Sequence, residues 1–97
     1  MQEFLHVKEK SFLSYLYERY ISTLEVTFTL RVKDYALFQV KNYEQLCNLL
    51  SAMTIRNYIT YSAFTLANNK HTVKITLTEK ALNRFNKALL QKTVNQQ

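Results

Sequence analysis

The chain has 97 residues and contains neither glycine nor proline, which restricts its turns more than any other feature does. Glycine reaches positive φ without steric cost, so a chain that lacks it must turn at other residues, above all asparagine and aspartate. The best predicted turns are therefore Lys33-Asp34 and Asn68-Asn69. Glycine-rich loops that cradle phosphate, such as GxxxxGK[ST] and GxGxxG, are excluded outright.

Between these turns, the spacing of apolar residues predicts three helices and four strands. Helical spacing occurs over residues 11–21, over 42–56, and from Thr78 onward, and Asn42 and Thr78 are the expected N-caps of the second and third helices. Alternation of apolar and polar residues predicts strands over 23–33 and 71–77, and composition adds strands over 35–40 and 58–66. The sequence thus predicts an α+β fold of order αββαββα, with an antiparallel four-stranded sheet covered by helices on one face.

No linker interrupts this pattern, so a single domain is expected over residues 1–97. Residues 1–10 and 93–97 are expected to be frayed or peripheral. The apolar stripes predict which side chains are buried. The second helix should bury Leu46, Leu49, Leu50 and Met53, and the third Leu82, Phe85 and Leu89.

Charge is distributed unevenly along the chain, whose net charge is +6. Residues 1–48 hold six basic and six acidic side chains, whereas residues 49–97 hold seven basic side chains and one acidic one. A cationic half beside a neutral half suits a polyanionic partner, although a charge of this size also serves solubility alone. The pattern favours nucleic acid and leaves an acidic protein partner open.

Constellations typical of enzymes and metal sites are missing from the sequence. The single cysteine, Cys47, has no neighbouring histidine, and His6 and His71 lack the spacing of metal ligands. We therefore expect no enzyme activity, no cofactor and no metal. One cysteine and no apolar run near 20 residues favour a cytoplasmic protein without a membrane segment.

Two stretches within residues 42–90 resemble the winged-helix class of DNA-binding domains. Residues 54–59, TIRNYI, are similar to a stretch common in recognition helices. Residues 73–80, VKITLTEK, are similar to the second wing strand as it runs into a closing helix. The resemblance implies DNA binding, with Arg56 near the recognition helix and Lys70 at the tip of the hairpin.

The order of elements also resembles the LAGLIDADG fold, whose unit is helix–hairpin–helix–hairpin–helix. Residues 13–21, LSYLYERYI, occupy the place of its signature helix, and Glu18 matches its first acidic position. Tyr20 stands where that family has its metal-binding acid, and both glycines of the signature are absent. This resemblance implies a degenerate relative that binds DNA with its sheet and has no nuclease chemistry.

We therefore expect a small, basic, non-catalytic nucleic-acid-binding protein, such as a regulator or accessory factor, with DNA favoured over RNA. The alternative is a small inhibitor or adaptor that binds an acidic surface on a protein partner. A homodimer is compatible with either function. The predicted nucleic-acid-binding residues are Arg31, Lys33, Arg56, Lys70 and Lys74.

Overall fold

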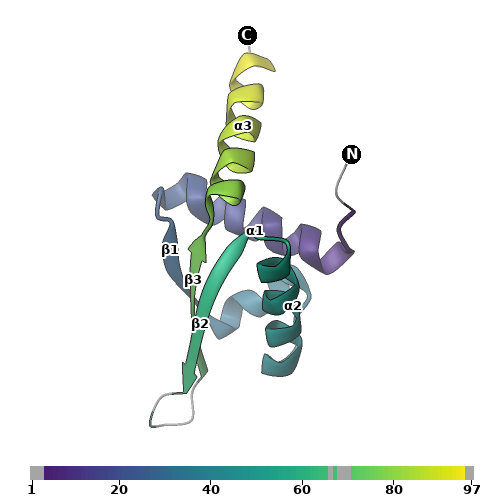
Figure 1. Ribbon diagram of the computed structural model, residues 1–97, viewed down its shortest axis with the longest axis vertical. Helices are drawn as coiled ribbons and strands as arrows, with labels where there is room; N and C mark the ends of the chain where they lie inside the picture. Colours follow the sequence, from purple (N-terminus) through teal and green to yellow (C-terminus); the bar gives the residue numbers. More distant parts are fainter. Residues whose placement is uncertain (1–3, 66, 68–70, 96–97) are drawn as a thin grey trace.

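The computed structural model describes residues 4–65, 67 and 71–95 (Figure 1). Three α-helices, one 3-10 helix and three strands make up this part of the chain, so the predicted α+β class is confirmed. In chain order they are α1 (Val7–Thr23), β1 (Thr27–Leu30), the 3-10 helix η1 (Val32–Phe38), α2 (Tyr43–Ile55), β2 (Ile59–Thr65), β3 (His71–Leu77) and α3 (Glu79–Asn95).

The three strands form one antiparallel sheet in the order β1-β3-β2, with the last strand of the chain in the centre. Thr27 pairs with Thr76 at one side of β3, and Thr60 pairs with the same residue at the other side. This register places Phe28, Ile75 and other apolar side chains on one face, where they are buried, and hydroxyl side chains on the opposite face. Within the described residues the sheet has three strands, so a four-stranded sheet is not confirmed.

The strand predicted over residues 35–40 is replaced by η1, which begins at Val32. Tyr35 and Phe38 lie three residues apart and are both buried, whereas Leu37 is exposed. This spacing fits one side of a helix and not the alternating faces of a strand. An unbroken apolar run such as YALF does not distinguish a helical turn from a buried strand by its pattern, which explains the wrong prediction.

Helix caps agree with the sequence prediction at α2 and α3. Gln45 donates its backbone N–H to Oδ1 of Asn42 at 2.9 Å, and Ala81 donates its backbone N–H to Oγ1 of Thr78 at 3.3 Å. Helix α1, in contrast, begins at Val7, several residues before the expected start. Its first turn is held by the His6 N–H, which donates to the Glu9 carboxylate at 3.0 Å.

Without glycine, the chain uses other residues where positive φ is required. Leu24 (φ 58°), Gln39 (φ 62°) and Asn57 (φ 66°) follow α1, η1 and α2. Each residue reverses the chain direction at the end of a helix, in the left-handed region that glycine normally occupies. The predicted turn at Asn68-Asn69 lies outside the described residues.

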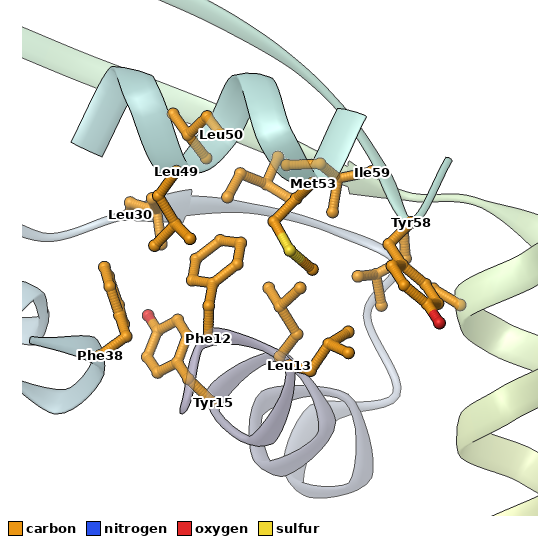
Figure 2. Packing of buried hydrophobic residues seen from close by; sticks show 14 of the residues in the cluster. Phe12, Leu13, Tyr15, Leu30, Phe38, Leu49, Leu50, Met53, Tyr58 and Ile59 are labelled. Atoms are coloured by element: carbon orange, nitrogen blue, oxygen red, sulfur yellow. The ribbon is translucent and has the colours of Figure 1, made fainter. Parts of the chain in front are cut away.

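The core lies between the buried face of the sheet and helices α1 and α2. Figure 2 shows Phe12 of α1 pointing toward α2, with Phe38 beside it; their ring centroids are 4.9 Å apart. The four apolar residues predicted for α2 are all buried: Leu46, Leu49, Leu50 and Met53. Leu5 and Glu9 are also buried, although residues 1–10 were expected to be peripheral.

Helix α3 departs from the predicted arrangement. Phe85 in its second turn is buried against Tyr17 and Tyr20 of α1, with ring centroids 5.6 and 6.1 Å apart. Beyond that point the helix continues away from the end of the sheet (Figure 1), and Leu89, which was expected inside, is 39% exposed. Thus α1 and α2 lie on the buried side of the sheet, while most of α3 projects past it.

Candidate nucleic-acid interface

Helix α2 has one apolar face in the core and one polar face on the surface. The exposed side chains recur at helical spacing opposite the buried stripe: Glu44, Asn48, Ser51, Thr54 and Ile55. Asn48 and Ser51 lie in the middle of this face and are exposed, and Asn48 borders a hollow that the first turn of α1 also lines. Neither residue was among the predicted nucleic-acid-binding residues. Their positions opposite the Leu46–Met53 stripe do, however, predict that both are exposed.

The β2–β3 hairpin is connected to the start of α2 by a ring contact. The Tyr43 ring stacks on the His71 ring, with centroids 3.9 Å apart and planes 12° from parallel. Tyr43 also lies one helical turn before Cys47, which is half-buried, and a hydrogen bond with that thiol together with burial raises the pKa of Tyr43. The start of β3, at the loop end of the hairpin, is therefore held beside the first turn of α2.

The five predicted nucleic-acid-binding residues do not form one cluster. Lys74 is exposed on the open face of β3, directly opposite Thr29 of β1. Arg31 follows Leu30 in an extended conformation and Lys33 lies in the first turn of η1; both are exposed. Lys70 lies outside the described residues. Arg31 and Lys33 line a hollow between α1 and η1, whereas Lys74 is on the open face of the sheet.

Arg56 has a partner inside the protein. Its Nε donates to Oε2 of Glu9 at 2.5 Å, and the Glu9 side chain is only 5% exposed. Burial alone would raise the pKa of the Glu9 carboxyl, but the His6 N–H and the Arg56 guanidinium together hold that pKa below its usual value. The predicted contact of Arg56 with nucleic acid stays a prediction; the observed pair joins the end of α2 to the start of α1.

A second cluster joins α1 to η1. The Tyr15 hydroxyl donates to the Asp34 carboxylate at 2.8 Å, and Arg19 lies over the Phe28 ring, 4.5 Å from its centroid. Burial and the hydrogen bond to Asp34 raise the pKa of Tyr15 to about 12. The Arg19 guanidinium is 3.8 Å from the same carboxylate, so this cluster is internally paired.

Two cations of α3 have contacts with the body of the protein. Arg84 donates to the Tyr58 hydroxyl at 2.8 Å, and Lys80 donates to the Arg56 carbonyl at 2.7 Å. The Lys80 ammonium also lies 4.4 Å from the centroid of the Tyr58 ring. The polar stripe of α3 therefore fixes this helix to the start of β2 as well as facing solvent.

Metal clusters, membrane helices and exposed tyrosine rings are other features that could indicate a function. In the described part of the chain, no three histidine, cysteine, aspartate or glutamate residues are grouped so that they could hold a metal ion. Among those residues there is also no helix with the length and apolar character that crossing a membrane requires. Tyr15 and Tyr58 are buried, which fits a position at the edge of the core and not the stacking of bases.

Comparisons with protein-family models, curated proteins and solved structures give no match.

Proposed function

We propose that this protein binds double-stranded DNA without catalysis, through the exposed face of α2 and the β2–β3 hairpin. The observation that carries the proposal is the arrangement around α2. The short helix η1 precedes α2, the β2–β3 hairpin follows it, and α3 comes last in the chain. These parts correspond to the recognition helix, wing and closing helix that the winged-helix resemblance implies.

The order of elements favours this resemblance over the LAGLIDADG-like one. A LAGLIDADG-like unit requires a hairpin directly after its first helix, and the segment that would supply the second strand of that hairpin is η1. Strand β1 instead pairs with β3, which lies beyond α2 in the chain. The first helix packs against α2 and η1, while β1 adds a third strand to the hairpin at the edge of β3.

The chemistry of the α2 face suits base edges better than phosphates. Asn48 can make paired hydrogen bonds to adenine in the major groove, and Ser51 accepts or donates to several bases. Helix α2 itself contains no lysine or arginine, so phosphate contacts must come from its surroundings. Lys41 just before the helix, Lys74 on the hairpin and Lys33 on η1 are exposed cations able to supply them.

Binding is tested by fluorescence anisotropy with a labelled random duplex, followed by selection of preferred sites from a random pool. The parent protein should bind the random duplex at low salt, and its affinity should fall steeply as salt rises. The double variant Asn48→Ala, Ser51→Ala should lose preference for the selected site by roughly 10-fold or more, because base contacts are worth about 1–3 kcal/mol each. Its binding to the random duplex should change little.

A matched pair of charge variants tests the phosphate contacts. Changing Lys70 and Lys74 to glutamine should weaken duplex binding and reduce the salt slope by about two. The same change at Lys10 on α1 and Lys87 on α3 is the control, since both are exposed cations on other elements. If both double variants bind alike, or the parent binds no nucleic acid, the acidic-protein-partner alternative replaces this proposal.

A further inference from the structure

The face of the sheet that points away from the core has an unusual and uniform chemistry. Its outward positions include six hydroxyl residues: Thr27, Thr29, Thr60, Ser62, Thr72 and Thr76. The two remaining outward positions are Lys74, in the centre, and Phe64, on the edge strand β2. Among these eight described positions there is no carboxylate, so the surface is polar and cationic.

Its composition does not suit packing against a second sheet or another apolar protein surface. Sheets that stack on one another bury apolar inner faces. This face instead presents hydroxyl groups, and the Oγ1 atoms of Thr27 and Thr76 are hydrogen-bonded to each other at 3.1 Å. Hydroxyl groups and a lysine can instead contact the sugars and phosphates of a nucleic acid. The charge of the face therefore favours an anionic occupant rich in hydrogen-bonding groups.

The Phe64 side chain distinguishes between a single-stranded and a double-stranded partner. The side chain is 49% exposed, although it stands on a strand among hydroxyl residues. An exposed aromatic ring on an open sheet can stack on a base only where the base has left a duplex, since paired bases are covered by their neighbours. The ring therefore indicates a single strand.

The register brings the Phe64 ring close to the Lys74 side chain. Ser62 pairs with Lys74 and Phe64 pairs with Thr72, so Phe64 and Lys74 are diagonal neighbours, about 7–8 Å apart at their backbones. Arg31, which follows β1, is exposed but lines a hollow between α1 and η1, so Lys74 is the cation of the open face. A strand of nucleic acid crossing the sheet would meet a stacking ring and then the Lys74 ammonium group.

We propose that this open face binds single-stranded nucleic acid, with Phe64 stacking on a base and with Lys74 contacting a phosphate. This site shares Lys74 with the proposed duplex interface, but it does not use Asn48 or Ser51 and does not depend on base contacts by α2. We therefore expect variants of Phe64 to lose single-strand binding and variants of Asn48 and Ser51 to lose duplex site preference, each without loss of the other activity.

The test measures anisotropy of a labelled oligo(dT) strand at low salt, with the full chain. Phe64→Ala and Phe64→Leu should each weaken binding by about 5- to 150-fold, because stacking on one base is worth roughly 1–3 kcal/mol. Leucine keeps an apolar side chain but cannot stack, so equal losses identify stacking as the cause. Leu37→Ala, which alters a comparably exposed apolar residue on η1, is the control and should bind like the parent.

A fluorescence experiment reports the contact directly. The chain contains no tryptophan, so Phe64→Trp introduces a unique probe at this face. Its emission should be quenched on addition of oligo(dT), while a Leu37→Trp probe should not respond. Lys74→Gln should reduce the salt slope by about 0.7, the value expected for one phosphate contact on a single strand.

The results that overturn the proposal are distinct from those that overturn duplex binding. Parent-like oligo(dT) binding by both Phe64→Ala and Phe64→Leu, or no oligo(dT) binding by the parent, removes the single-strand site. Duplex binding by the α2 face is then judged on the Asn48→Ala, Ser51→Ala variant alone. Retained oligo(dT) binding in that variant, together with its loss in Phe64→Ala, supports two separate surfaces.

Discussion

The ion pair between Arg56 and Glu9 should make a large contribution to stability, and Arg56→Met isolates it. Methionine keeps much of the length and apolar contact of the arginine stem but removes the guanidinium. The variant leaves the Glu9 carboxylate, 3% exposed as a residue, without its cationic partner. The His6 N–H still donates to that carboxylate, and the Arg56 carbonyl still accepts from Lys80.

Breaking a fully buried pair from one side costs about 3–5 kcal/mol. Because the Arg56 side chain is 26% exposed, water screens part of the interaction, and we expect a loss of about 2–3 kcal/mol. A domain of this size has only roughly 5–15 kcal/mol of stability, so the melting temperature should fall by roughly 10–20 °C. Glu9→Gln should cost less, since Arg56 can then turn to solvent.

Urea denaturation followed by circular dichroism measures these losses at pH 7 and at lower pH. The pKa of Glu9 is lower in the folded protein than its usual value of 4.5, so the pair stabilises the fold above that pH. As pH falls below 4.5 toward the lower pKa of the folded state, the contribution is lost progressively, and it is absent once the carboxylate of the folded protein is protonated. The difference between parent and Arg56→Met should therefore narrow in acid.

A double variant, Glu9→Gln with Arg56→Met, separates the pair from other effects of each substitution. Its loss should be smaller than the sum of the single losses by about 1–2 kcal/mol, since the interaction can be removed only once. Single variants that each unfold within 0.5 kcal/mol of the parent, or a difference that does not vary with pH, would refute the reasoning.

Three further outcomes are expected. Leu24→Gly should raise stability by up to about 1 kcal/mol, because relief of the left-handed backbone outweighs the added freedom of the unfolded chain; a lower melting temperature would contradict this. Leu49→Ala and Phe85→Ala should each cost about 2–5 kcal/mol in urea denaturation, and unchanged unfolding of both would mean that the apolar faces are misassigned. Tyr15 should titrate near pH 12 by ultraviolet difference spectroscopy, so the stability that its protonated hydroxyl lends falls between pH 10 and about 12; Asp34→Asn should lower that midpoint.

Local patterns predicted those parts of the fold that depend on neighbours in sequence. The stripe of α2, its Asn42 cap and the alternation of β3 are all local, and the structure agrees with each of them. The strand predicted over residues 23–33 is shorter in the structure and covers Thr27–Leu30. Alternation predicts which side chains share a face, but the ends of a strand depend on its hydrogen-bonded partner. No local pattern indicates that β1 pairs with β3.

Side-chain partners were the least predictable feature of the candidate site. Arg56 was selected because it lies near the end of a predicted recognition helix, but its partner Glu9 is 47 residues earlier in the chain. Phe64 is on the same strand face as Thr60 and Ser62, and the apolar residue Ala63 precedes it, so the sequence shows no alternation that would predict its exposure. Such features follow from tertiary packing between residues far apart in the chain, which a short stretch of sequence does not reveal.

The position of β3 in the middle of the sheet has a consequence for the order of folding during synthesis. Strands β1 and β2 are both made before β3, and neither is hydrogen-bonded to the other in the sheet. The 41 residues from Leu30 to His71 take roughly 2–8 s to translate at about 5–20 residues per second, so β1 must wait for its partner. Until β3 emerges, α1 and α2 can associate only around an incomplete core, and closure of the sheet becomes a late, cooperative step.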